Sequence, residues 1–141
     1  MEKNLKIFLV DDEIFCLNLY QQMIHNLGFE DVSTFQNGYR CLEQLDQAPD
    51  VIFLDHHMHA IEGFDLLKKI KRRNPDLFVI ILSGQESLQL AVDALKFGAF
   101  DYLVKGDQEE EKIGKVLQRI MEINRVEKQN KPSIIKKLLF L

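Results

Sequence analysis

Five polar side chains in this sequence stand where apolar runs of strand length end, and their types suit phosphoryl chemistry. Asp11 and Asp12 follow one run, Asp55 a second, Ser83 a third and Lys105 a fourth. Three carboxylates held close together repel one another, and a divalent cation relieves that repulsion. Because every one of these ligands is an oxygen, the pattern favours Mg²⁺, or Mn²⁺, over a softer metal.

Asp55 is the candidate nucleophile of this group. A carboxylate can accept a phosphoryl group as an acyl phosphate, and a cation beside it offsets the charge that builds during in-line transfer. The ammonium of Lys105 and the hydroxyl of Ser83 are suited to bind the oxygens of that phosphoryl group. The set contains no general base directed at water. This favours a phosphoryl group that persists over one that is quickly hydrolysed.

Short apolar runs alternate with amphipathic segments, and this alternation predicts the elements that position the five residues. The run before Asp55 is apolar throughout, which is typical of a strand buried on both faces. The alternation predicts an α/β fold with a five-stranded parallel sheet and helices on both faces. The carboxyl ends of such strands meet at one edge, where ligands of open α/β sheets bind. The predicted strands are 7–10, 32–35, 51–55, 78–82 and 101–105, and the predicted helices are 14–27, 39–45, 64–73, 87–97 and a last one capped by Asp107.

Composition narrows the class of protein. The 141 residues fit one domain, and a net charge of −4 argues against a nucleic-acid binder, which needs a concentrated basic face. No apolar run approaches the ~20 residues of a membrane span, and no secretory leader is evident. Cys16 and Cys41 are too few for a disulfide framework or a zinc site. They are expected to be thiols of a cytoplasmic protein.

The last part of the chain differs in composition from the rest. Residues 125–141 hold five basic residues against one acidic residue, whereas residues 1–124 are acidic overall. Pro132 interrupts the helical pattern, and the apolar and basic residues after it could form a short amphipathic turn that is marginal alone. We therefore expect one domain over 1–124. The basic extension over 125–141 could dock on a neighbouring chain, begin a linker to an output region, or be disordered.

The order and spacing of these residues resemble the receiver domain of response regulators in two-component signalling, such as the chemotaxis regulators. The likeness covers about residues 5–124. No single motif is specific, but the combination is. It consists of Asp11-Asp12, Asp55 followed by Met58 and Gly63, Ser83, the run Gly98-Ala99-Phe100-Asp101-Tyr102, and Lys105.

The resemblance implies a flavodoxin-like fold with strand order 2-1-3-4-5 and a phosphorelay switch. It implies that a histidine kinase or a phosphotransfer protein donates a phosphoryl group to Asp55. Asp12, Asp55 and the backbone carbonyl of His57 would bind Mg²⁺ directly, and Asp11 would act mainly through water. Such a domain is not an enzyme in the usual sense, because it catalyses only its own phosphorylation and slow dephosphorylation.

The resemblance also implies a switch pair and an output surface. Ser83 and Tyr102 would turn towards the phosphoryl group and change the surface of the fourth helix, fifth strand and fifth helix, where a downstream protein or a second copy binds. Helical spacing in 87–97 leaves Leu90 and Phe97 outside, which makes them candidate interface residues. The inner face is predicted to contain Leu88, Ala91, Val92 and Leu95.

Other functions remain open at this point. Gly106 stands where the family has a cis proline, and a more flexible turn there would suit a docking module that works without phosphate. An aspartate-nucleophile phosphohydrolase commonly has a second carboxylate where this chain has His57. A flavin-binding module would need a first loop that accepts phosphate, but residues 11–13 are acidic.

Three histidines lie close together after the central strand. His56, His57 and His59 could bind zinc or nickel. They are more simply interpreted as exposed residues of a loop beside the carboxylate site.

Overall fold

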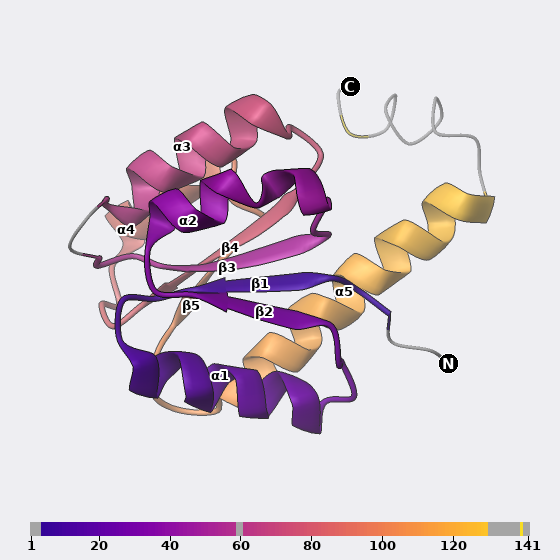
Figure 1. Cartoon of the computed structure of the whole chain (residues 1–141), viewed down its shortest axis with the longest axis horizontal. Coiled ribbons are helices and arrows are strands. Elements are labelled where there is room, and N and C mark those ends of the chain that lie inside the picture. Colours follow the sequence, from indigo (N-terminus) through magenta and orange to yellow (C-terminus); the bar gives the residue numbers. More distant parts are fainter. Residues whose placement is uncertain (1–3, 59–60, 130–138, 140–141) are drawn as a thin grey trace.

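The sheet is the element around which the chain is built (Figure 1). In a computed structural model, which describes residues 4–58, 61–129 and 139, five parallel strands pair in the order β2-β1-β3-β4-β5. This confirms the predicted fold and strand order. The strands are β1 Ile7–Val10, β2 Val32–Phe35, β3 Val51–Asp55, β4 Phe78–Ser83 and β5 Asp101–Val104.

Helices cover both faces of this sheet, α2, α3 and α4 on one and α1 and α5 on the other (Figure 1). Each crossover between parallel strands carries a helix, as parallel pairing requires. The helices are α1 Ile14–Asn26, α2 Gly38–Glu43, the short η1 Leu45–Gln47, α3 Gly63–Arg73, α4 Leu88–Lys96 and α5 Glu109–Gln129.

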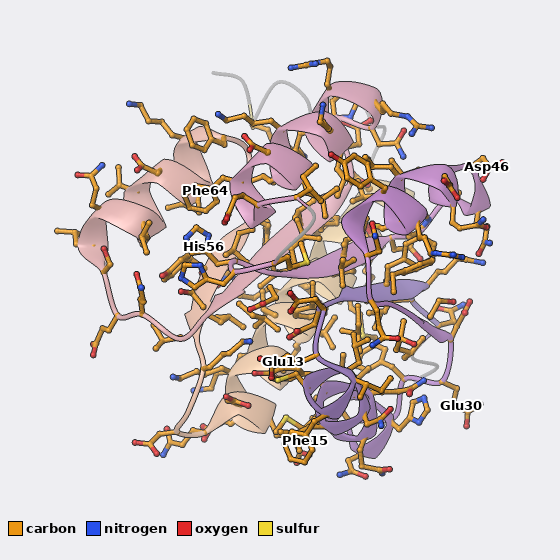
Figure 2. The ribbon with its side chains drawn as sticks, turned by 60° about the vertical axis from the view of Figure 1, so that its left-hand side comes forward. Glu13, Phe15, Glu30, Asp46, His56 and Phe64 are labelled. Carbon is orange, nitrogen blue, oxygen red and sulfur yellow. The ribbon has the colours of Figure 1, made fainter. Side chains whose placement is uncertain are left out.

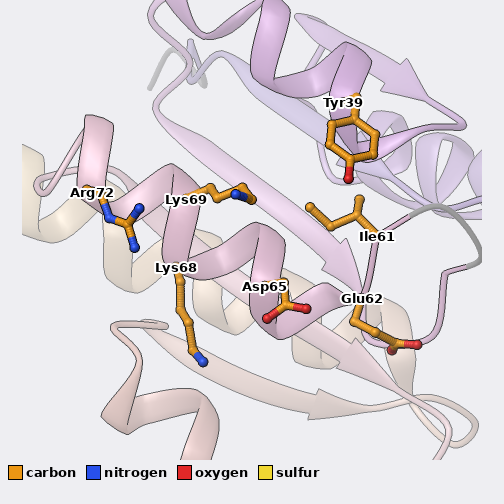
Figure 3. Close-up of a pocket in the computed structure, with 7 residues that line it drawn as sticks. All are labelled: Tyr39, Ile61, Glu62, Asp65, Lys68, Lys69 and Arg72. Carbon is orange, nitrogen blue, oxygen red and sulfur yellow. The ribbon is translucent and has the colours of Figure 1, made fainter.

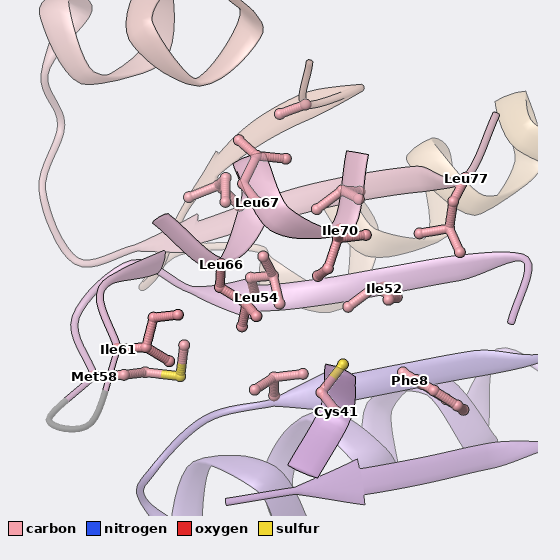
Figure 4. Close-up of a cluster of buried hydrophobic side chains, with 14 of the residues drawn as sticks. Phe8, Cys41, Ile52, Leu54, Met58, Ile61, Leu66, Leu67, Ile70 and Leu77 are labelled. Carbon is pink, nitrogen blue, oxygen red and sulfur yellow. The ribbon is translucent and has the colours of Figure 1, made fainter. Parts of the chain in front are cut away.

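The core has two layers because side chains on a strand point alternately to opposite faces. Phe8, Ile52 and Leu54 point towards α2 and α3, where they meet Cys41, Leu66 and other apolar side chains (Figure 4). On the opposite face, side chains of β1, β3 and β4 pack on α1 and α5. Val51 to Leu54 are at most 1% exposed, which confirms the prediction that the central strand is buried on both faces. The second layer contains Ile7, Leu9, Val51, Phe53, Ile80, Leu82, Leu17, Tyr20, Ile24, Ile113, Val116, Leu117 and Ile120.

The fifth helix differs from its prediction at its start. It begins at Glu109, and Asp107 lies in the turn before it. Gln108 has a φ of 58°, in the left-handed region, so the helix cannot run back to Asp107. The helix continues to Gln129, past the predicted domain end at 124. The turn predicted after Pro132 lies outside the described residues.

The helices α1 and α4 each bury only part of their apolar residues, and the predicted inner face of α4 is wrong. In α1 the buried residues are Leu17, Tyr20 and Ile24, whereas Leu19 is 41% exposed. In α4 the buried residue is Ala94. Within the described part of the chain, no helix is both long and apolar enough to cross a membrane.

In α4 the residues predicted to be exposed and those predicted to be buried are exchanged. Phe97 packs against the core and Leu90 is half-buried, so neither is the exposed apolar residue that the periodicity suggested. Leu88, Val92 and Leu95, which were placed inside, are 82%, 46% and 54% exposed.

Candidate functional site

Strand pairing brings the predicted site residues to one edge of the sheet. Asp55 ends β3 beside Leu82 of β4, and Ser83 ends β4 beside Val104 of β5. Asp11 follows β1, the other neighbour of β3. The backbone N–H of Lys105 donates to the Ser83 carbonyl at 2.7 Å, which continues the pairing one residue past β5. The sequence therefore predicted correctly that the polar strand ends meet.

Three carboxylates form the acidic part of the site. Asp11, Asp12 and Asp55 each present an oxygen within 4.8 Å of the others. Asp11 is 4% and Asp55 7% exposed, and Asp12 is half-buried. Burial raises the pKa of Asp11, although the backbone N–H of Glu13, which donates to Asp11 Oδ1 at 2.9 Å, and Lys105 act in the opposite direction. A cluster of hard oxygen ligands of this kind fits a small divalent cation.

Lys105 supplies the positive charge. Its Nζ lies 2.7 Å from Asp55 Oδ1 and 3.4 Å from Asp11 Oδ2. Burial alone would lower the pKa of Lys105, but the hydrogen bond and the charge of Asp55 outweigh burial, so that the pKa is raised. Although Gly106 follows it, the Lys105 side chain is directed at the predicted phosphoryl acceptor.

Ser83 and Tyr102 are joined through a residue that the sequence analysis missed. Ser83 is fully buried, and its Oγ accepts the backbone N–H of Gln85 at 3.1 Å. The carbonyl of Gln85 in turn accepts the Tyr102 hydroxyl at 2.7 Å. Gln85 acts through its backbone, so its side-chain type carried no signal. Only its place two residues after Ser83, in the turn that follows β4, pointed to it.

The histidines after β3 do not share one environment. His56 is buried, with its ring 4.5 Å from that of Phe64 in α3 (Figure 2), whereas His57 is exposed. This corrects the prediction that both are exposed loop residues. Burial, and then His57, lower the pKa of His56. His59 lies outside the described residues, so the hypothesis of a histidine metal site stays untested.

A groove of about 440 Å³ opens between α2 and α3 (Figure 3). Charged side chains of α3, among them Asp65, Lys69 and Arg72, line it together with Tyr39 of α2. None of the three clustered carboxylates lines this groove. The chemistry-bearing residues therefore lie at the sheet edge and not in the groove.

Known proteins share both the sequence pattern and this architecture. The family model "Response regulator receiver domain" matches residues 7–118. The chemotaxis protein CheY of Listeria monocytogenes is 32% identical over 102 residues, which cover 72% of this chain and 86% of that protein. The transcriptional regulatory protein ZraR of Escherichia coli K12 is 37% identical over 103 residues, 72% of this chain but only 23% of that protein.

Solved structures give the same result. A response regulator receiver domain protein from Clostridium thermocellum superposes with a TM-score of 0.78 at 29% identity, over 86% of this chain and 98% of that one. NtrX from Brucella abortus gives 0.79 at 27% identity, over 89% of this chain and 29% of its own. With the acidic cluster, the lysine and the serine all at the carboxyl edge of the sheet, this chain belongs to the response regulator receiver domains, the phosphoryl-accepting switches of two-component signalling.

Proposed function

We propose that Asp55 is the phosphoryl acceptor of this domain, and that Lys105 and Ser83 bind the phosphoryl oxygens. The observation that carries the proposal is the 2.7 Å contact between Lys105 Nζ and Asp55 Oδ1 at the acidic edge of the sheet. An ammonium already directed at the acceptor oxygen is pre-organised for the charge that develops during transfer. The Ser83 hydroxyl accepts the Gln85 N–H, so its own hydrogen is available to a phosphoryl oxygen.

The acidic cluster fits Mg²⁺, or Mn²⁺, as the metal of this site. Asp12 and Asp55 would hold the ion directly with the backbone carbonyl of His57, and Asp11 would act mainly through water. One Asp11 oxygen already accepts the Glu13 N–H and the other lies near Lys105, which supports an indirect role. The bound ion would offset the negative charge on the carboxylate and on the phosphoryl oxygens.

The transfer itself requires one bond to form as another breaks. An oxygen of Asp55 attacks phosphorus in line, and the bond between phosphorus and the donor breaks, with its electron pair leaving on the donor group. A phosphohistidine of a histidine kinase or a phosphotransfer protein is the donor we propose. Its imidazole takes up a proton from solvent as it leaves. The domain acts in this scheme as a switch, because the product stays on Asp55.

Ser83 and Tyr102 are proposed as the switch pair. In this structure Gln85 connects them, since its N–H binds Ser83 Oγ and its carbonyl binds the Tyr102 hydroxyl. If the serine turns to a phosphoryl group on Asp55, the Gln85 turn loses one of its two bonds. Tyr102 is then released, and the surface of α4, β5 and α5 changes for a downstream protein or a second copy of the domain.

Two further expectations accompany this function. We propose that the receiver unit corresponds to residues 1–124, and that residues 125–141 are a basic extension or the start of a linker. We also propose a cytoplasmic location, which the free thiols Cys16 and Cys41 support. Because the match covers only 23% of ZraR, any output activity of a longer protein is a separate question.

Intact mass spectrometry tests the proposed chemistry. The protein is incubated with acetyl phosphate, with Mg²⁺ or with a chelator, beside the Asp55→Asn variant. We expect a gain of one phosphoryl group that requires Mg²⁺ and is absent from the variant. A folded protein that binds Mg²⁺ yet gains no mass, from acetyl phosphate or from phosphoramidate, would instead favour a docking module that works without phosphate.

A further inference from the structure

The turn after Lys105 is built in a way that a proline could not support. Gly106 has a φ of 126°, a region that glycine enters readily and that proline, with φ fixed near −65°, cannot. The Gly106 N–H also donates to Glu109 Oε1. Proline has no N–H to donate. Glycine at this position therefore donates a hydrogen bond that proline could not donate.

The same carboxylate connects this turn to α1. Tyr20, buried in α1, donates its hydroxyl to Glu109 Oε1 at 3.3 Å. The ring of Tyr20 lies beneath the lysine, with its centroid 5.8 Å from Lys105 Nζ. Glu109 and Tyr20 thus hold the residue after Lys105 and flank the lysine itself.

The backbone on the other side of Lys105 is also held. The Lys105 N–H is bound to the Ser83 carbonyl at 2.7 Å, and Lys112 Nζ lies 3.4 Å from the Val104 carbonyl. The strand side of the lysine is therefore fixed by sheet pairing. Glu109 supplies the corresponding restraint on the loop side, where Gly106 would otherwise leave the turn flexible.

We propose that Glu109, together with Tyr20, is a positioning residue that directs Lys105 at Asp55 through the Gly106 N–H. This inference rests on the proposed role of Lys105 in phosphorylation. Glu109 touches neither Asp55 nor the carboxylate cluster, so it acts through Lys105 and not on the reacting atoms. The alternative is that Glu109 only stabilises the first turn of α5, as an acidic side chain near the start of a helix commonly does.

The neighbouring residue is a matched control. Glu110 Oε1 accepts Asn26 Nδ2 at 3.2 Å, so it also connects α5 with α1. Within the described part of the chain it has no contact with the Lys105 turn, and it is exposed. Removal of either carboxylate removes one hydrogen bond between α1 and α5. Only removal of Glu109 releases Gly106.

The test compares Glu109→Ala, Glu109→Gln and Glu110→Ala in the full chain. The readouts are the maximal rate of phosphorylation by acetyl phosphate and the Mg²⁺ concentration that gives half of that rate. We expect Glu109→Ala to lower the maximal rate about tenfold, because a misdirected catalytic group is slow even when it is present. We expect the Mg²⁺ requirement not to rise, because the clustered carboxylates keep their places and lose only a competing lysine. Glu109→Gln keeps an acceptor oxygen and should restore most of the rate, and Glu110→Ala should match the wild type.

Amide hydrogen exchange of Gly106 is the second measurement, and it does not depend on phosphorylation. Exchange should accelerate in Glu109→Ala and stay unchanged in Glu110→Ala. A Glu109→Ala rate equal to that of Glu110→Ala, or unaltered exchange at Gly106, overturns the positioning role. If the wild type itself gains no phosphoryl group, the proposed function fails, whereas slow exchange at Gly106 would still show that the restraint exists.

Discussion

At the level of single residues, the pairing of Lys105 with carboxylates competes with the phosphoryl-binding role that we propose for it. In the absence of metal it is the cation nearest to Asp55 and Asp11, at 2.7 and 3.4 Å, and offsets the repulsion between buried carboxylates. A divalent cation bound to the same carboxylates would take over part of that task. The lysine is then available to the oxygens of an incoming phosphoryl group. Metal binding and lysine pairing are therefore alternatives for the same negative charge.

This competition predicts how Lys105→Ala behaves without any phosphodonor. Without metal the variant should lose about 1–2 kcal/mol of unfolding free energy, since unpaired buried carboxylates remain, although the partly exposed lysine keeps the loss below that of a fully buried pair. It should bind Mg²⁺ more tightly than the wild type. At a concentration 100-fold above its dissociation constant, Mg²⁺ should stabilise either protein by about 2.7 kcal/mol.

Urea unfolding and titration calorimetry check this prediction. Lys115→Ala is the control, because Lys115 is exposed and pairs with Glu111 of its own helix. Weaker Mg²⁺ binding in Lys105→Ala than in Lys115→Ala would contradict the competition.

The sequence predicted the position of a candidate site residue where that residue stands at a strand end. Asp11, Asp55, Ser83 and Lys105 could be found this way, because a change from apolar to polar residues marks the end of each strand. Gln85 could not be found, since its backbone and not its side chain joins the network. Contacts that depend on turn geometry leave no periodic pattern in a sequence.

At the scale of elements, the site depends on how closely α3 begins beside the end of β3. Gly63 is the first residue of α3, and its N–H donates to the His56 carbonyl at 3.1 Å. A Cβ at this position would lie 2.7 Å from the Asp55 carbonyl oxygen and 2.9 Å from His56 Cα. Both are backbone atoms, which cannot move without shifting the end of β3. Only glycine, which has no Cβ, fits at this position without displacing these backbone atoms.

Gly63→Ala should therefore destabilise the protein and disturb the site together. We expect a loss of about 2–3 kcal/mol in unfolding free energy, typical of overpacking against atoms that cannot yield. We also expect weaker Mg²⁺ binding, because Asp55 moves with the strand. Gly84→Ala is the matched control, since a Cβ there meets nothing within 4 Å. Urea midpoints that fall equally for the two variants would show that the close approach at Gly63 is not limiting.

Helix α4 shows why periodicity alone did not determine which side faces the core. Two sets of apolar residues in it have identical spacing, Leu88, Val92 and Leu95 on one side, and Leu90, Ala94 and Phe97 on the other. The first set has more large aliphatic side chains and was predicted to be buried. The small Ala94 is the fully buried residue, because it allows α4 to approach the sheet closely.

Alanine substitutions on the two sides of α4 should therefore differ in their cost. Phe97→Ala removes a ring that packs against the core, 5.7 Å from the ring of Phe64, and should cost about 2 kcal/mol of unfolding free energy. Leu95→Ala should change stability by no more than about 0.5 kcal/mol, because its side chain is exposed. Thermal and urea unfolding measure both. A larger loss of unfolding free energy in Leu95→Ala than in Phe97→Ala would support the arrangement that the periodicity suggested.

At the level of the whole molecule, α5 leads from the domain to residues 130–141. Its buried residues Ile113, Val116, Leu117 and Ile120 complete one layer of the core. Beyond Ile120 the helix continues to Gln129 with half-buried and exposed positions as far as Glu127. The length of the chain predicted one domain over 1–124. It could not locate the end of the helix, because the final turns of α5 are held by their own backbone and not by a periodic apolar face.

A shortened chain tests whether residues 1–124 form the complete switch. A protein ending at Asn124 should keep its Mg²⁺ binding and its phosphoryl gain, with a loss of less than about 1 kcal/mol, since helix ends fray at little cost. A protein ending at Arg119 is the matched control. It loses Ile120, which is fully buried, and should be destabilised by about 2 kcal/mol or more. Failure of the longer form to accept phosphate while folded would mean that the extension takes part in the switch, and that the functional unit is larger than its core.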